Sequence, residues 1–222
     1  MNRFINMLLM FLLIPTMLMA IYVGFDLPVM FLKTNGAHIP FRGEIFLGLG
    51  LLIFIVNLRR SIRRWMGIRI VAQQTKFKWN APVSSTRKRR IITYTSLEVL
   101  VMTFVGVALY QVTPQAWIPT LAFLVGALDN VIFTIVGIKG NHYRIGLSSK
   151  ALIVADREII LLYFKGLRKI SVQQQSIYFD YIKGLQLTFP SDCIEDEHRA
   201  EFFKLLEEQI DSDRVFFSKN LV

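Results

Sequence analysis

Cysteine is nearly absent from this 222-residue chain, which contains Cys193 alone. A single cysteine excludes an internal disulfide and a metal site built from several thiolates. Glu195 and His198 have the spacing of a metal-binding helix pair, but they stand alone on an acidic segment, so we interpret them as a solvated face. No phosphate-binding loop and no pattern for nucleophilic catalysis is present. The sequence therefore predicts a protein that is not an enzyme, with no catalytic residue, cofactor or metal site.

Acidic residues are scarce in residues 1–138, which hold four of them against 14 lysines and arginines. Residues 139–222 hold 12 charges of each sign, so the net charge of +10 belongs to the first part. Long apolar runs are confined to that part, and none after residue 139 is long enough to cross a membrane. With 53% hydrophobic and 19% charged residues, the composition predicts membrane segments followed by a small soluble domain.

Four apolar runs predict four transmembrane helices, at about residues 4–25, 44–58, 91–112 and 116–138. The second run is short, and it spans a bilayer only if Arg59 and Arg60 extend from its end to the headgroups. The third and fourth runs are separated by "TPQA", which predicts a tight antiparallel hairpin. We therefore divide the chain into a transmembrane domain, residues 1–138, and a soluble domain, residues 139–222.

The loop at residues 59–90 carries 11 basic residues and no acidic one, whereas the loops at 26–43 and 113–116 carry two basic residues together. Loops rich in lysine and arginine stay on the cytoplasmic side of a membrane. The bias therefore predicts that loop 59–90, both termini and the soluble domain lie in the cytoplasm. We expect this membrane to be the inner (cytoplasmic) membrane of the cell.

The basic loop also contains aromatic residues, among them Trp65, Phe77 and Trp79, a composition typical of segments that lie on anionic headgroups. A solvated loop that only sets the topology, without recognising a lipid, explains the pattern equally well. Nucleic acid is disfavoured as a partner, because both ends of the loop are tied to spans. The residues expected to contact anionic lipid are Arg59, Arg60, Arg63, Arg64, Arg69, Lys76, Lys78, Arg87, Lys88, Arg89 and Arg90.

Two carboxylates lie inside predicted spans. A carboxylate in a span costs about 2.5–3.5 kcal/mol on insertion scales, so Glu98 and Asp129 are expected to face the bundle interior. They lie at similar depth, eight residues from Arg90 and ten from Lys139. Asn130 belongs to the small polar stripe beside Asp129. Two interpretations stay open: a shared proton, bound cation or subunit contact on one hand, and protonated carboxyls bonded to nearby threonines or Asn130 on the other.

Alternation of apolar and polar residues between 142 and 189 predicts about six strands, in "HYRIGLS", "ALIVA", "EIILLYF", "LRKISV", "SIYFDYI" and "LQLTF". The pentapeptides "YFKGL" (163–167) and "YIKGL" (181–185) predict two tight turns in which glycine supplies a positive φ. After Pro190 the pattern becomes helical, with Asp192 as the expected cap. The expected buried stripe of this helix is Phe202, Leu205, Leu206 and Ile210.

Several strands closed by one amphipathic helix are the order of a pleckstrin-homology-like (PH-like) domain. The chain resembles bacterial PH-like membrane proteins of the YcxB-like kind, in which spanning helices precede a sequence like "HYRIGLSSKALIV" and "LTFP" leads into an acidic helix like "EDEHRAEFFKLLEEQ". The resemblance covers about residues 140–210, and it departs from the family in showing six strands instead of seven and four spans where many members have two. It implies a small α+β PH-like domain that binds or regulates and performs no chemistry.

These features together predict a multi-pass membrane adaptor or accessory subunit whose cytoplasmic PH-like domain binds a protein partner or organises a membrane complex. Membrane lipids and further copies of the chain are the other expected partners. The alternatives are a ligand-gated effector or channel, with the C-terminal domain as its sensor, and a small transporter. A pore or a transporter requires a polar face through several spans, and the first two predicted helices offer almost none.

Overall fold

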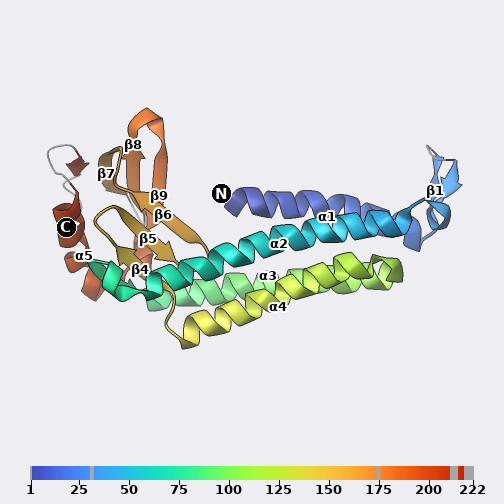
Figure 1. Cartoon of the computed structure of the whole chain (residues 1–222), viewed down its shortest axis with the longest axis horizontal. Coiled ribbons are helices and arrows are strands. Elements are labelled where there is room, and N and C mark those ends of the chain that lie inside the picture. The colour runs from blue at the N-terminus through green and yellow to red at the C-terminus, as the bar shows by residue number, and fades with distance from the viewer. Residues whose placement is uncertain (1, 31–32, 174–175, 211–214, 218–222) are drawn as a thin grey trace. The chain divides into compact units, whose positions relative to one another are not determined.

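The computed structural model of the chain describes residues 2–30, 33–173, 176–210 and 215–217. The chain divides into two compact units, one formed by Met1–Ile62 with Tyr94–Phe133 and the other by Arg63–Thr93 with Thr134–Val222. We call them the helical unit and the sheet unit, after the elements that dominate each (Figure 1). The sheet unit therefore takes residues from the expected basic loop as well as from the expected soluble domain.

The helical unit is built from four helices that are long and apolar enough to cross a membrane, which is consistent with a membrane protein. They are α1 (Asn2–Gly24), α2 (Arg42–Ala72), α3 (Ser85–Val112) and α4 (Trp117–Lys139). Apolar side chains from all four pack into one core, which includes Leu12, Ala20, Phe46, Ile53, Met102, Leu109, Ala122 and Phe123. The four predicted helices are thus confirmed, and α2, α3 and α4 also contribute residues to the sheet unit.

Helix α2 is longer than the sequence indicated. The predicted span ended at residue 58, but α2 runs for 31 residues, from Arg42 to Ala72, and includes the four clustered arginines. Arginine is a good helix former and nothing before Ala72 breaks the helix, so the change in polarity at Arg59 does not end it. A helix of this length measures about 46 Å, whereas the hydrocarbon core of a bilayer is about 30 Å thick. Helix α2 is therefore longer than a bilayer crossing requires, and its arginine-rich end is not needed to span the hydrocarbon core.

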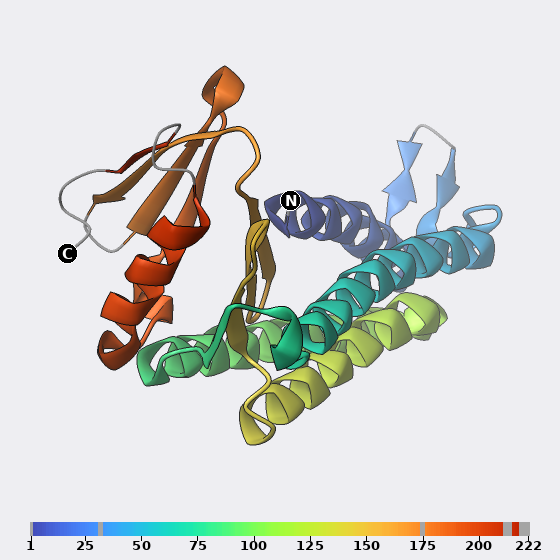
Figure 2. The ribbon, with the colours of Figure 1, turned by 60° about the vertical axis from the view of Figure 1, so that its left-hand side comes forward.

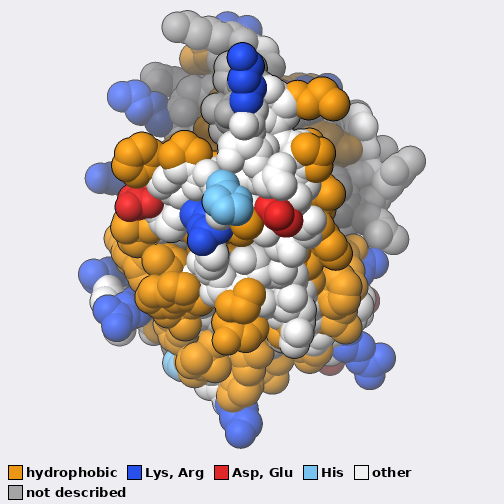
Figure 3. Space-filling view, turned by 90° about the vertical axis from the view of Figure 1, so that its right-hand side faces the viewer, with side chains coloured by type: hydrophobic (Ala, Val, Ile, Leu, Met, Phe, Trp, Pro, Cys, Tyr) orange, Lys and Arg blue, Asp and Glu red, His pale blue; other side chains and the backbone are white. Residues whose placement is uncertain are grey.

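Short elements connect α1 to the start of α2 and the end of α3 to the start of α4. Strands β1 (Pro28–Val29) and β2 (Thr34–Asn35) form an antiparallel ribbon, followed by the 3₁₀ turn η2 (Gly36–His38), and η4 (Pro114–Ala116) joins α3 to α4. The Asp26 carboxylate accepts a hydrogen bond of 2.8 Å from the Ala37 N–H and holds the ribbon closed. Apolar side chains dominate this face and charged ones are scattered over it (Figure 3).

Besides the ends of α2, α3 and α4, the described residues of the sheet unit form two four-stranded sheets and the helix α5 (Asp196–Gln209) (Figure 2). The first sheet has the order β3 (Trp79–Pro82), β4 (Arg144–Leu147), β5 (Ala151–Ala155), β6 (Ile159–Tyr163), with every pair antiparallel. The second has the order β10 (Phe216–Phe217), β7 (Leu167–Gln173), β8 (Ser176–Tyr181), β9 (Gln186–Pro190), in which β10 alone pairs in parallel. Three 3₁₀ turns connect these elements: η3 (Gln74–Lys76), η5 (Ile182–Gly184) and η6 (Ser191–Cys193).

Six of these strands, β4 to β9, confirm the alternation read from the sequence. Strand β3 was not predicted, and it comes from the middle of the segment expected to be a basic loop. It pairs with β4 in the register Trp79 to Leu147 and Pro82 to Arg144. The hairpin of α3 and α4 is therefore inserted between two neighbouring strands of one sheet.

Helix α5 packs on the sheets through aromatic side chains. The ring of Phe202 lies 5.2 Å from Trp79 and 6.0 Å from Phe189, measured between centroids. Burial of each such side chain contributes about 1.5–3 kcal/mol. Leu206 of the predicted stripe is also buried. The prediction that Asp192 caps this helix is wrong, because α5 begins only after Glu195.

Gly67 provides a test of how α2 packs on the first sheet. A Cβ atom built on Gly67 would lie 2.3 Å from both Cδ1 and Cγ1 of Ile159, whereas one built on Gly48 meets nothing within 4 Å. We predict that Gly67→Ala gives a lower midpoint of thermal unfolding in detergent than Gly48→Ala, because both variants gain the helix propensity of alanine but only the first forces the Ile159 side chain to move. Gly48→Ala, in the same helix, should leave the midpoint unchanged or raise it, since alanine is the better helix former. Equal midpoints for the two variants would contradict the packing of Ile159 on α2.

Candidate functional site

Polar side chains of α2, α3 and α4 meet inside the helical unit. We call this set the helix-bundle cluster, and its members are Asn57, Arg60, Ser61, Glu98, Asp129 and Asn130. The cluster includes all three intramembrane polar residues selected from the sequence. Two of its other members, Arg60 and Ser61, are consecutive residues of α2, and each donates a hydrogen bond to a carboxylate of a neighbouring helix.

The Arg60 guanidinium forms a forked ion pair with Glu98. Both carboxylate oxygens accept a bond, with 2.8 Å between Nη2 and Oε2, and the side chains of Arg60 and Glu98 are 10% and 21% exposed. Two parallel charge-assisted bonds make this the strongest geometry available to such a pair. The sequence placed Arg60 among the residues that contact headgroups, and this needs correction. The Arg60 guanidinium instead supplies a counter-charge to the half-buried Glu98 carboxylate.

Asp129 and Asn130 of α4 also have partners within the cluster. The Ser61 hydroxyl donates a hydrogen bond of 2.8 Å to the Asp129 carboxylate. The amide of Asn130, which is almost fully buried, donates to Met102 Sδ at 3.5 Å, and Asn57 Nδ2 lies 3.4 Å from the Ala122 carbonyl oxygen. Glu98 and Asp129 thus each have a donor on α2. The sequence indicated the two acids but missed these donors, since the arginine cluster was interpreted as a topology signal and as a contact with lipid headgroups.

The remaining basic residues expected at the lipid surface differ in exposure. Arg64 is buried at 5% exposure. Lys88 is half-buried and its ammonium donates to the Asn141 side chain at 2.9 Å, and Arg63 and Arg87 are also half-buried. The exposed members of this set are Arg59, Arg69, Lys76, Lys78, Arg89 and Arg90, and contact of the set with headgroups stays a prediction.

A second polar set lies in the sheet unit, where α3 begins. We call it the α3 joint, and its members are Ser84, Ser85, Arg87, Arg90, Asp156, Asp192 and Glu195. Ser84 is the N-cap residue of α3, because its Oγ accepts a bond of 3.0 Å from the Arg87 N–H. The same hydroxyl donates to the Asp192 carbonyl oxygen, and the Ser84 N–H donates to the Cys193 carbonyl at 2.9 Å. One serine therefore caps the helix and attaches it to η6.

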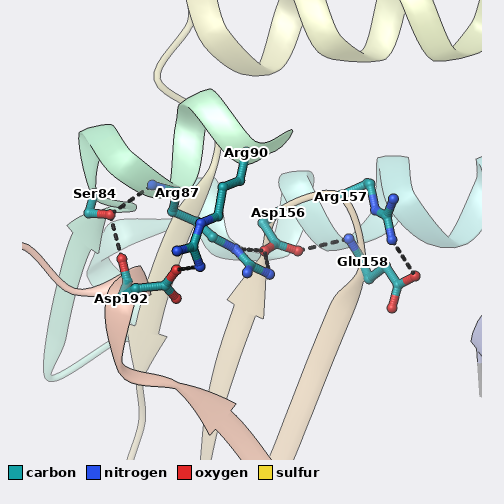
Figure 4. A network of polar contacts seen from close by, with 7 residues as sticks. All are labelled: Ser84, Arg87, Arg90, Asp156, Arg157, Glu158 and Asp192. Atoms are coloured by element: carbon teal, nitrogen blue, oxygen red, sulfur yellow. Dashed lines mark hydrogen bonds and ion pairs between the residues drawn. The ribbon is translucent and has the colours of Figure 1, made fainter. Parts of the chain in front are cut away.

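Arg87 and Asp156 form the buried centre of the joint (Figure 4). The guanidinium donates through Nε and Nη2 to Asp156 Oδ2, at 2.8 and 2.6 Å. The other carboxylate oxygen accepts the Glu158 N–H at 2.8 Å, which closes the turn between β5 and β6. Asp156 is only 2% exposed, so Arg87 supplies the counter-charge that makes its burial possible.

Two further acidic residues reach the first turns of α3. Arg90 forms an ion pair with Asp192 (Figure 4). The Glu195 carboxylate accepts bonds from the N–H and the hydroxyl of Ser85, at 3.1 and 3.3 Å. A carboxylate at a helix N-terminus is stabilised by the unpaired N–H groups and by the helix dipole. The turn between β5 and β6, which contains Asp156, and the segment that contains Asp192 and Glu195 therefore both contact the start of α3.

The chemistry of these residues favours a structural joint over a reactive site. Burial raises the pKa of the Cys193 thiol to about 12, so this side chain stays protonated at neutral pH and is a poor nucleophile. A cavity of about 420 Å³ adjoins the joint, lined by Ser84, Asp192, Glu195 and Arg199 among others. Within the described part of the chain, no group of three His, Cys, Asp or Glu side chains is arranged to hold a metal ion. His198 instead packs edge-on against Trp79.

The pair of Arg60 and Glu98 predicts a strong energetic coupling. Glu98→Leu and Arg60→Met should each lower stability by about 3 kcal/mol, because each removes the forked ion pair and leaves the other side chain without this counter-charge. The double variant should lose at least about 1 kcal/mol less than the sum of the two, measured by thermal or denaturant unfolding in one detergent. Arg59→Met, at the exposed neighbouring position, is the control and should change little. Additive losses would show that the two side chains do not interact.

The joint predicts that the start of α3 depends on Asp156. Asp156→Ala should speed hydrogen exchange of the amides of residues 84–90, because Arg87 loses its partner and the cap loosens. Arg89→Gln is the matched control, since Arg89 is exposed and lies in the same turn. Mass spectrometry of the exchanged chain in detergent micelles measures both variants. Equal exchange in the wild type and Asp156→Ala would show that the ion pair does not hold the helix start.

The chain was compared with known protein families, with curated proteins and with solved structures, and none of the three comparisons gives a match. The resemblance to PH-like membrane proteins therefore rests on the sequence pattern. What the protein does has to be argued from the helix-bundle cluster, the α3 joint and the surfaces of the sheet unit.

Proposed function

We propose that this protein is a multi-pass adaptor or accessory subunit of the bacterial inner membrane, with both termini and the sheet unit in the cytoplasm. In this proposal the sheet unit is a PH-like domain that binds a protein partner or organises a membrane complex. The observation that carries the proposal is the insertion of α3 and α4 between β3 and β4. A binding domain built around the ends of spanning helices is suited to present a partner at the membrane.

The strand count supports the PH-like interpretation. A PH fold requires seven strands before its closing helix, whereas the sequence alone indicated six. Strand β3 supplies one more, so that four strands of the first sheet and three consecutive strands of the second, β7 to β9, precede α5. The short β10 follows the helix and is an addition to this order.

The helix-bundle cluster favours an adaptor over a channel or transporter. Glu98 is paired with Arg60, and Asp129 accepts a bond from Ser61, so donors within the bundle already meet both carboxylates. A path for ions or protons needs polar groups that exchange water or ligand along the span. These side chains instead bond one helix to another, as expected of residues that specify helix packing.

The rival function with a specific observation behind it is a ligand-gated effector. The α3 joint connects a spanning helix to two turns of the sheet unit through Asp156 and Asp192. A ligand that moved either turn would act directly on the start of α3. This reading shares the PH-like domain with the adaptor and differs in what the helices do.

Two measurements on the full chain separate the adaptor from the effector. We predict that the tagged chain, purified from its native membranes in mild detergent, retains a partner at fixed stoichiometry. We also predict that the purified chain in liposomes does not raise the flux of K⁺ or H⁺ above that of empty liposomes. A chain that purifies without a partner and conducts ions would refute the adaptor and support the effector.

A further inference from the structure

The two pentapeptides "YFKGL" and "YIKGL" lie side by side in the sheet unit. The Ile182 N–H donates to the Gly166 carbonyl oxygen at 2.9 Å, and the Tyr181 hydroxyl donates to the Tyr163 carbonyl oxygen at 2.7 Å. Gly166 and Gly184 have φ angles of +83° and +74°, a conformation that other residues rarely adopt. Both turns therefore use a glycine with a positive φ, and they are bonded to one another.

Large apolar side chains are exposed at these turns. Tyr163 is 57% exposed, Leu185 55%, Ile182 49% and Leu161 38%. Among the described residues after 139, Phe216 is the only other large apolar side chain in this class. Exposed apolar residues scattered singly are ordinary, but a contiguous group on a small domain marks an interaction site. We call these four residues the twin-turn surface.

The rim of the twin-turn surface is basic. Lys165 is exposed within the first turn and Arg168 just after it. Lys150 is exposed as well, and its carbonyl oxygen accepts the Phe164 N–H at 2.9 Å, which holds it beside the same turn. The nearest acid along β8, Asp180, is half-buried and accepts a bond of 2.8 Å from Gln186. An occupant with acidic groups around an apolar centre complements this arrangement.

The register of the first sheet places the twin-turn surface away from the helix connections. Tyr163 pairs with Ala151, whereas Arg144 pairs with Ala155 at the other end of the strands. Arg144 and its partner Pro82 lie at the end where the chain continues into α4 and α3. Within the first sheet, Tyr163 therefore lies at the end of the strands opposite to the residues that lead into α3 and α4.

We propose that the twin-turn surface is the docking site for an acidic and apolar segment of the partner protein. Apolar side chains of that segment cover Tyr163, Ile182 and Leu185, and its aspartates and glutamates meet Lys150, Lys165 and Arg168. This proposal rests on the adaptor function and assigns it a surface and a partner chemistry.

A random library of phage-displayed 12-residue peptides is the probe, selected on the full chain in nanodiscs. The recovered peptides should combine apolar residues with flanking Asp or Glu. A fluorescent synthetic copy should bind at least about tenfold more weakly to Ile182→Ser/Leu185→Ser, the loss expected when central apolar contacts are removed. Lys165→Glu should weaken it as well. Phe216→Ser removes the other exposed apolar side chain and should bind as the wild type does. Thermal unfolding of every variant controls for folding.

Several outcomes would overturn the proposal. Neutral or basic peptides, or equal binding to Ile182→Ser/Leu185→Ser, would show that the surface does not select acidic apolar segments. A concentration-dependent dimer that the same double variant abolishes would make a second copy the occupant. A native partner that co-purifies equally with the double variant would leave the adaptor function standing and place its docking site elsewhere. Absence of a partner from the wild type would instead count against the adaptor function.

Discussion

Burial of the Asp156 carboxylate is the constraint on which the start of α3 depends. A charge that is 2% exposed has to be neutralised nearby, and Arg87 is the residue that does so. Arg87 lies in the first turn of α3, which begins at Ser85, shortly after β3 ends at Pro82. The Ser84 cap and the contacts of Glu195 with Ser85 then satisfy the N–H groups that this helix start leaves unpaired. Strand pairing, helix capping and charge neutralisation therefore require the same boundary.

The same kind of reasoning explains the helical unit. In a bilayer no water is available to solvate a carboxylate, so its partner must come from a neighbouring helix. Arg60 and Ser61 are adjacent in α2, and consecutive helix residues point about 100° apart, so one can face α3 while the other faces α4. Their bonds to Glu98 and Asp129 fix the rotation of α2 against both neighbours. Apolar contacts alone would allow several rotations of α2 about its axis, and the bonds of the cluster select one of them.

The local pattern of apolar and polar residues was enough to predict the strands from β4 to β9 and the existence of the four helices. Each of these elements has its own pattern within a short stretch of sequence. Strand β3 was missed for a physical reason: its four residues include a proline, lie among basic residues and pair with β4 more than 60 positions away. The end of α2 was missed because polarity changes at Arg59 while helix propensity does not. Within the helix-bundle cluster, Glu98 and Asp129 were identified from the sequence because a carboxylate inside a span is energetically costly. Their donors were not, since an arginine at a membrane boundary has the same sequence signature whether it faces lipid or a carboxylate.

The inserted hairpin also constrains how the chain can fold. Strands β3 and β4 are separated in sequence by α3 and α4, and closing so long a flexible loop costs entropy. An antiparallel pair of helices removes most of that cost, because it returns the chain close to the point where it left. Pairing of Trp79 with Leu147 and of Pro82 with Arg144 is then nearly local. The entropic cost of pairing β3 with β4 is therefore smaller when α3 and α4 form a hairpin than when the same segment is a flexible loop.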